Sequence, residues 1–163
     1  WDLLLGSVHW IGGFAVDVSE LSGEFRRRGV EHVYEEYFAL ETELAGSGKV
    51  DVLAHVDVVK KHGHRVTPER VDLYQDVAAA AAASDTAIEI SSAGLFAPCA
   101  EVYPSPTFLQ VLHDNAVGIT MASDAHRPER VGRDFDRVRS AARDAGYTER
   151  IEFRRRQGTA VPL

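Results

Sequence analysis

Short apolar runs alternate along this chain with longer segments in which apolar residues recur every three or four positions. The runs have the length of buried strands and cover residues 3–8, 50–54, 86–90 and 117–122. The longer segments predict helices over residues 31–45, 67–84 and 105–115 and a fourth helix before Gly146. Because this alternation is typical of β/α units around a parallel sheet, the sequence predicts an α/β fold.

Cap and turn residues set the expected boundaries of these elements. Thr67-Pro68 and Ser105-Pro106 each have the pattern of an N-cap followed by proline at the first helical position. Gly46 and Gly146 are expected to stop the helices that precede them. Residues 11–28 are rich in glycine and lack helical periodicity, so they predict a long loop over the rim of the sheet.

The predicted elements form one domain over residues 1–163, because no linker divides them. Residues 151–153 predict a last strand, which brings the expected total to five strands and four helices. A closed eight-unit β/α barrel typically needs about 250 residues. The chain starts at Trp1 and enters an apolar strand almost at once, so we expect an N-terminal truncation of a longer barrel.

Three of the predicted strands are followed by side chains that bind metals. His9 and His55 follow the first two runs, and Asp124 and His126 follow the run that ends at residue 122. In β/α barrels the chemistry lies at the carboxyl ends of the strands, so these four residues are expected on one rim.

The pair formed by Asp124 and His126 is the most informative of these. Residues two apart in extended backbone project to the same side, and a carboxylate beside an imidazole suits Zn, Mn or Fe. Such a pair can help to lower the pKa of bound water. The alternative is a solvated turn in which Asp124 caps the next helix, because a D-x-H pattern is short.

Charge and composition narrow the class of partner. The 18 basic and 25 acidic residues give a formal charge of −7, which argues against binding to nucleic acid or to an anionic membrane. The single cysteine, Cys99, excludes an intrachain disulfide and fits a reducing compartment. No apolar stretch approaches the ~20 residues needed to span a bilayer, so the expected location is the cytoplasm.

Five ordered motifs resemble those of histidinol-phosphate phosphatases in the PHP (polymerase and histidinol phosphatase) superfamily. They are Gly6-Ser7-Val8-His9, Ala54-His55-Val56-Asp57-Val58-Val59-Lys60, Glu89-Ile90-Ser91-Ser92-Ala93-Gly94-Leu95, Glu101-Val102-Tyr103-Pro104-Ser105 and Ser123-Asp124-Ala125-His126-Arg127-Pro128. The resemblance implies a distorted, TIM-like (β/α)7 barrel, of which this chain would form the C-terminal two thirds. It also implies a rim that holds up to three divalent metals (Zn, Mn or Fe) and hydrolysis of L-histidinol phosphate, a step of histidine biosynthesis.

The same resemblance assigns roles to individual residues. His9, His55, Asp124 and His126 match metal ligands, and Asp124 and His126 would also belong to the catalytic centre. Two departures stand out. The family's N-terminal H-x-H motif and a further acidic ligand lie before the part that this chain matches. In addition, Phe96 and Ala97 follow Leu95, where many relatives carry a basic residue that contacts phosphate.

Other residues are candidates for binding the substrate. Lys60 or Arg127 could bind the phosphate. Ser91, at the end of its strand, is a further candidate for contacting the substrate. Glu89 could meet the substrate amine or brace a ligand, although a carboxylate at a strand end can also be structural. Asp57 could orient His55 or cap the following turn.

The leading interpretation is therefore a metal-dependent phosphomonoesterase that acts on a small phosphate ester. A second is another PHP-type phosphoesterase that acts on nucleotides or nucleic-acid ends, which the acidic balance disfavours. A third is an inactive fragment that keeps partial metal affinity. The sequence leaves the native metal and the oligomeric state open.

Overall fold

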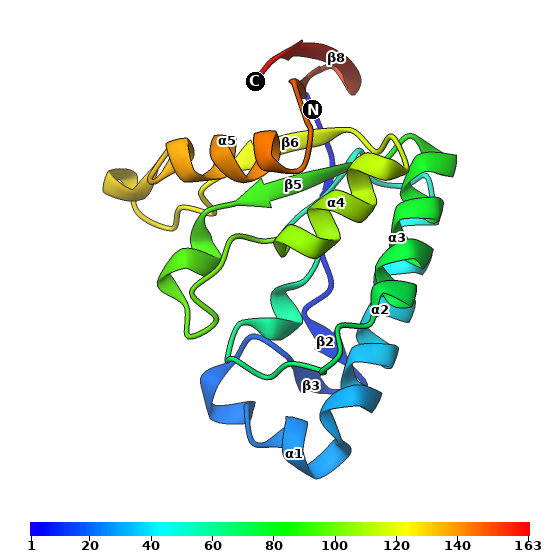
Figure 1. Ribbon diagram of the computed structural model, residues 1–163, viewed down its shortest axis with the longest axis vertical. Helices are drawn as coiled ribbons and strands as arrows, with labels where there is room; N and C mark the ends of the chain where they lie inside the picture. The colour runs from blue at the N-terminus through cyan, green and yellow to red at the C-terminus, as the bar shows by residue number, and fades with distance from the viewer.

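A computed structural model of residues 1–163 shows a parallel sheet with helices packed beside it (Figure 1). The sheet has the order β1-β4-β5-β6 and is formed by β1 (Leu5–Gly6), β4 (Val52–Leu53), β5 (Ala87–Ser91) and β6 (Ile119–Ala122). All three strand pairs are parallel, and their spatial order follows their order in the chain. The predicted α/β class with a parallel sheet is confirmed.

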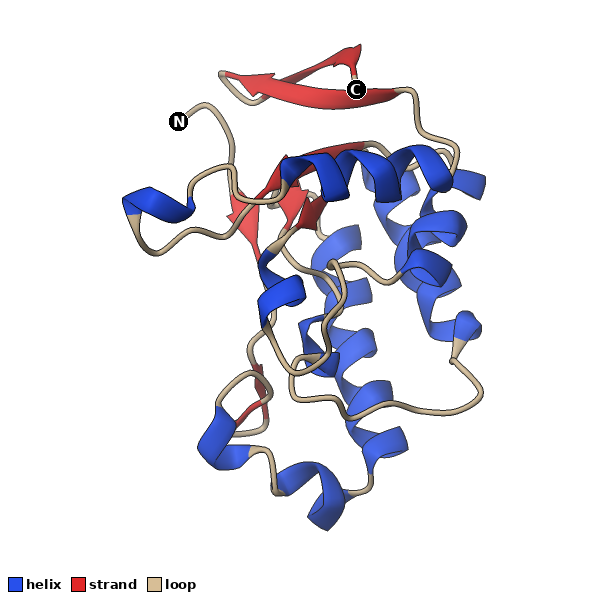
Figure 2. Ribbon diagram, turned by 60° about the vertical axis from the view of Figure 1, so that its left-hand side comes forward, coloured by secondary structure: helices blue, strands red, loops and turns tan.

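The connecting helices contact one another in chain order. Figure 2 shows them as blue ribbons beside the red strands. They are α2 (Val30–Gly46), α3 (Val71–Ser84), α4 (Pro106–Asp114) and α5 (Phe135–Asp144). Within the alanine run of α3, Ala78 and Ala81 are fully buried, so small side chains bring this helix close to its neighbours. The rings of Tyr74 and Phe108 stack 4.4 Å apart between α3 and α4. No helix is both long and apolar enough to cross a membrane.

Local signals correctly place the start of α4 and the end of α5. The hydroxyl of Ser105 accepts a hydrogen bond from the Phe108 N–H, and Pro106 occupies the first turn of α4, as predicted. Gly146 has a φ of +101° just after α5, which confirms it as the residue that ends the helix. The helix expected over residues 31–45 is confirmed to within a residue, although Gly46 is its last residue rather than the position beyond it.

The predicted start of α3 is wrong. The helix begins at Val71, and Thr67-Pro68 lies in the preceding loop. This loop is held against α2, because the Tyr34 hydroxyl donates to the carbonyl of His64. Arg70, in the same loop, makes ion pairs with Glu31 and Glu35 of α2. Contacts with a helix distant in sequence therefore outweigh the local cap signal.

Residues 11–28 are not a featureless loop, contrary to the prediction. A hairpin of β2 (Trp10–Ile11) and β3 (Phe14–Ala15) is followed by η1 (Ser19–Leu21) and α1 (Glu24–Arg28). Gly12 and Gly13 both have positive φ, which is the backbone that a two-residue hairpin turn requires. Ile11 and Phe14 are buried, so the hairpin packs into the core instead of lying over it.

The C-terminal segment also differs from expectation. The strand predicted over residues 151–153 is present as part of β7 (Glu149–Arg154), but β7 pairs in an antiparallel hairpin with β8 (Gln157–Pro162), which was not predicted. Arg155 and Arg156 form its turn with positive φ. Arg156 then binds the carboxylate of Asp51 at 3.0 Å, and its N–H donates to the carbonyl of Asp2. The N-terminal residues consequently lie against the turn of this hairpin.

Candidate metal centre

The parallel sheet brings His9, His55 and Asp124 to the same end of neighbouring strands. Each follows its strand by two or three residues, after β1, β4 and β6 respectively. The rings of His9 and His55 lie edge to face with centroids 5.0 Å apart. Burial lowers the pKa of His55, His9 lowers it further, and the charge of Asp124 opposes both. The rim predicted from the strand ends therefore exists for these three residues.

The backbone at two of these positions is unusual. His55 has a φ of +31° and Asp124 a φ of +47°, both in the left-handed region. Residues other than glycine adopt this region in only a few per cent of cases, and such conformations cluster at functional sites. The turns after β4 and β6 are thus shaped to present a side chain at the strand end.

His55 also has an unused coordinating atom. Its side chain is buried, with 7% of the residue exposed, and its Nδ1 has no hydrogen-bond partner. A metal binds the neutral form of imidazole, which is the form that the lowered pKa of His55 favours. An orphaned ring nitrogen beside a second imidazole and a carboxylate fits a divalent transition metal.

Asp17 joins this group, and the sequence prediction did not include it. Its carboxylate lies 3.2 Å from Nδ1 of His9 and 3.8 Å from the ammonium of Lys61. A carboxylate on the second nitrogen of an imidazole orients the ring and raises its basicity as a ligand. The only sequence signal was the Gly12-Gly13 pair, since the hairpin it forms turns the chain back toward His9.

Glu89 lies inside the same region. It is buried on β5, and burial, followed by the charge of Asp124, raises its pKa to about 7. A hydrogen bond from the backbone N–H of His55 acts in the opposite direction. Glu89 therefore lies between two of the candidate ligands. From there its carboxyl group can either brace a metal ligand or meet a substrate amine.

His126 is not drawn into the group. Its side chain is 82% exposed, and its Nδ1 lies 3.0 Å from the backbone carbonyl of Asp124 and 3.8 Å from the Asp124 carboxylate. No three His, Cys, Asp or Glu side chains of the chain take up the geometry of a complete metal site. The structure thus assembles part of the predicted ligand set.

Asp57 and Lys60 form a separate buried pair. The ammonium of Lys60 lies 2.7 Å from Asp57, 2.7 Å from Glu101 and 2.8 Å from the carbonyl of Val102. The Asp57 carboxylate also accepts the N–H of Ser105 at 2.8 Å. Asp57 makes no hydrogen bond to His55 and gives no side-chain cap to the turn that follows it. This pair joins the loops after β4 and β5.

The two remaining substrate candidates differ in accessibility. Ser91 is fully buried, and its hydroxyl accepts the N–H of Ala93. Its backbone pairs with Tyr103. Arg127 is exposed on the loop after β6. Of the two, only Arg127 is open to a ligand in this conformation.

Comparison with known proteins places this geometry in context. No protein-family model matches the chain. A relative from Deinococcus radiodurans, named "Probable histidinol-phosphatase", is 32% identical over 157 residues, which cover 96% of this chain and 59% of the relative.

Two solved structures share the fold. The histidinol phosphate phosphatase of Lactococcus lactis, solved with zinc, L-histidinol and phosphate, matches with a TM-score of 0.78 and 19% identity over 98% of this chain and 62% of that one. A Listeria monocytogenes protein, provisionally assigned as a histidinol phosphatase, matches with a TM-score of 0.73 and 20% identity over 82% of this chain and 56% of that one. The chain spans less than two thirds of the length of each of these proteins. The sequence match makes the chain a homologue of this probable histidinol-phosphatase over part of that protein's length, and the two solved structures show a shared fold.

Proposed function

We propose that this chain supplies part of the active site of a metal-dependent phosphatase that hydrolyses L-histidinol phosphate to L-histidinol and phosphate. The observation that carries the proposal is the convergence of His9, His55 and Asp124 at one end of the sheet, with the buried Nδ1 of His55 unpartnered. The homology to histidinol phosphatases supports the choice of substrate. A cytoplasmic location belongs to the same proposal.

His9, His55 and Asp124 would hold the divalent metals (Zn, Mn or Fe), and His126 would be a further ligand beside Asp124. Such metals supply charge neutralisation at the phosphoryl oxygens and lower the pKa of water. Asp17 keeps the ring of His9 oriented through Nδ1. Burial of His55 lowers its pKa, which favours the neutral imidazole, and keeps water from most of its ring.

Three residues that were predicted to contact the substrate receive different roles in this proposal. Glu89 is buried on β5 near Asp124 and is the group that would face the substrate amine. Arg127 is free to bind the phosphate. Lys60 would first have to leave Asp57 and Glu101, so we assign it to holding the loops rather than to the phosphate.

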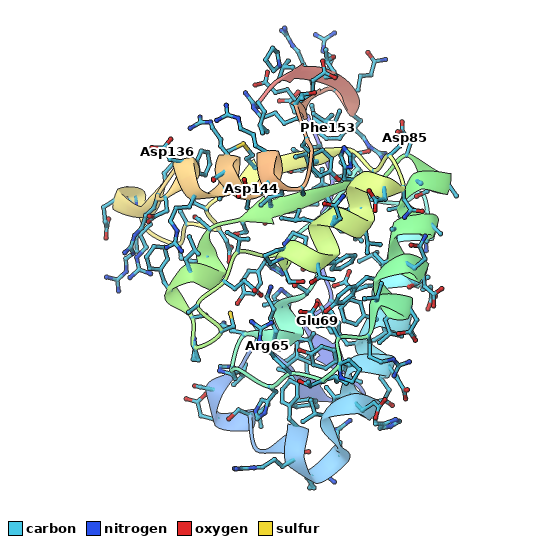
Figure 3. All side chains as sticks on the ribbon, viewed as in Figure 1. Arg65, Glu69, Asp85, Asp136, Asp144 and Phe153 are labelled. Carbon is cyan, nitrogen blue, oxygen red and sulfur yellow. The ribbon has the colours of Figure 1, made fainter.

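Replacing Asp124 with alanine tests the assignment. Loss of groups that merely orient metal ligands already costs about 10- to 100-fold in affinity or activity, so Asp124→Ala should lower turnover by more than about 100-fold. The measurement is phosphate release from histidinol phosphate, with zinc content by elemental analysis, in the protein at its natural length. Asp136→Ala, at a fully exposed carboxylate on α5 (labelled in Figure 3), is the matched control. Turnover of Asp124→Ala equal to that of this control would reject the role.

A domain with partial metal affinity and no phosphatase activity is the second candidate. It is favoured by the absence of a complete group of three ligand side chains in this conformation. A panel of histidinol phosphate, nucleoside monophosphates and a 3′-terminal oligonucleotide separates the possibilities. Release from the nucleotides alone would favour another phosphoesterase, whereas zinc binding without any release would favour the second candidate.

A further inference from the structure

A cation and an aromatic ring are stacked where the loops after β5 and β6 meet. The guanidinium carbon of Arg133 lies 3.3 Å from the ring centroid of Phe96. Phe96 ends η3 (Ala93–Phe96), which directly follows β5. Arg133 belongs to the loop between η4 (Pro128–Arg130) and α5. The pair therefore connects the carboxyl ends of two adjacent strands.

Two hydrogen bonds fix the backbone of this loop to the rim. The hydroxyl of Ser92 donates to the carbonyl of Arg133 at 2.7 Å, and the hydroxyl of Ser123 accepts the N–H of Gly132 at 3.1 Å. Ser92 follows β5, and Ser123 is the residue before Asp124. The backbone at Gly132 and Arg133 is consequently held against Ser92 and against Ser123, the residue before the candidate ligand Asp124, whereas Arg127 and Arg130 on the same loop have no comparable contact.

The guanidinium is oriented yet available to a ligand. Its side chain is 45% exposed, and its only charged neighbour is Asp134, whose carboxylate lies 3.5 Å from Nε. Neither terminal nitrogen of Arg133 has a hydrogen-bond acceptor in the protein. Stacking on a ring restricts the plane of the guanidinium and leaves its edge open, and that edge presents two parallel N–H donors suited to phosphate oxygens.

We propose that Arg133, held flat by Phe96, binds the phosphate group of the substrate. This inference rests on the proposed function for the identity of the ester, but the anion site itself stands on the geometry of the rim. The buried ammonium of Lys60 is already paired with Asp57 and Glu101. Arg133 supplies a positive charge from the loop after β6 that no acid buries, and Phe96 serves as its platform.

Binding of inorganic phosphate to the zinc-loaded protein, followed by calorimetry or ³¹P NMR, provides the test. Charge-assisted hydrogen bonds to an anion are strong, so Arg133→Ala should raise the dissociation constant about 10-fold. Arg133→Lys keeps the charge but loses the planar pair of N–H donors that stacks on Phe96. Its dissociation constant for phosphate should therefore lie between those of the parent and Arg133→Ala. Phe96→Ala should weaken binding by a few-fold through the loss of pre-organisation.

Arg139→Ala is the matched control, because Arg139 is similarly exposed and is paired with Asp136 on α5. Thermal unfolding of each variant checks that the fold is kept. Phosphate binding that is undetectable in the parent, or equal in Arg133→Ala and Arg139→Ala, would overturn the inference.

The KM for histidinol phosphate separates this inference from the proposed function. A raised KM for Arg133→Ala with kcat largely kept supports both. Arg133-dependent phosphate binding without hydrolysis of histidinol phosphate would sink the proposed function and leave the anion site standing. Hydrolysis of histidinol phosphate with the same KM in parent and Arg133→Ala would overturn the anion site and leave the proposed function standing.

Discussion

Glu41 is the one acidic side chain of α2 that is completely buried. The Tyr37 hydroxyl donates to its Oε1 at 2.7 Å, and its Oε2 has no partner. Burial raises the pKa of Glu41 to about 8, although the hydrogen bonds from Tyr37 and from the Val8 N–H act in the opposite direction. The carboxyl is therefore held in its neutral form beneath the segment that leads to His9.

A neutral Glu41 predicts how stability changes with pH. Below pH 4.5 the folded and unfolded states both hold the proton, whereas between pH 4.5 and about 8 only the folded state does. The stabilising effect of the neutral carboxyl is thus complete below pH 4.5 and is lost as pH rises through about 8. Relative to Glu41→Gln, the free energy of unfolding of the parent should fall by about 1.4 kcal/mol per pH unit across this window.

Urea unfolding at pH 5.5 and pH 7.5 measures this difference. Glu43→Gln, at an exposed position on the same helix, should leave the pH dependence of the parent unchanged. Parallel pH profiles for the parent and Glu41→Gln would show that Glu41 is ionised in the folded protein.

At the scale of elements, local sequence signals predicted a helix boundary correctly where a residue at that boundary caps the free backbone groups of the helix. Ser105-Pro106 predicted the start of α4 because the serine hydroxyl reaches the Phe108 N–H within the same turn. Thr67-Pro68 carried the same pattern, but the loop that contains it is held by Tyr34 and by the acidic side chains that bind Arg70. Propensity decides an element boundary only when no distant contact competes with it.

The cap of α4 gives a direct stability prediction. Ser105→Ala removes the acceptor of a buried N–H, and loss of an N-cap of this type costs about 1 kcal/mol. Ser140→Ala, at an exposed site on α5, should change the free energy of unfolding by less than about 0.5 kcal/mol. Chemical denaturation compares the two, and equal stabilities would mean that the cap contributes nothing.

At the scale of the whole molecule, the candidate metal centre links segments that are far apart in sequence. His9, His55 and Asp124 follow three different strands, and β5 with Glu89 runs between two of these strands. A metal held by these residues would tie three β/α units together at one end of the sheet. Metal binding should therefore stabilise the fold as a whole.

Zinc should raise the melting temperature of the chain, and EDTA should reverse the rise. A ligand that binds only the folded state at 100 times its dissociation constant adds about 2.7 kcal/mol to the free energy of unfolding. His55→Ala should lose most of this increment, while His32→Ala, exposed on α2, should retain it. Differential scanning calorimetry at pH 7 makes the comparison. An undiminished increment in His55→Ala would place the zinc elsewhere.

The sequence by itself determined the alternation of strands and helices and the residues that follow each strand, because both are local properties of the chain. Parallel β/α units necessarily gather their carboxyl ends, so the meeting of His9, His55 and Asp124 could be predicted without coordinates. Only the tertiary structure decided that Asp17 reaches His9, that Lys60 is neutralised by Asp57 and Glu101, and that Arg133 stacks on Phe96. These contacts depend on how separate loops fold over one rim, and no periodicity within a single segment encodes the distance between two loops.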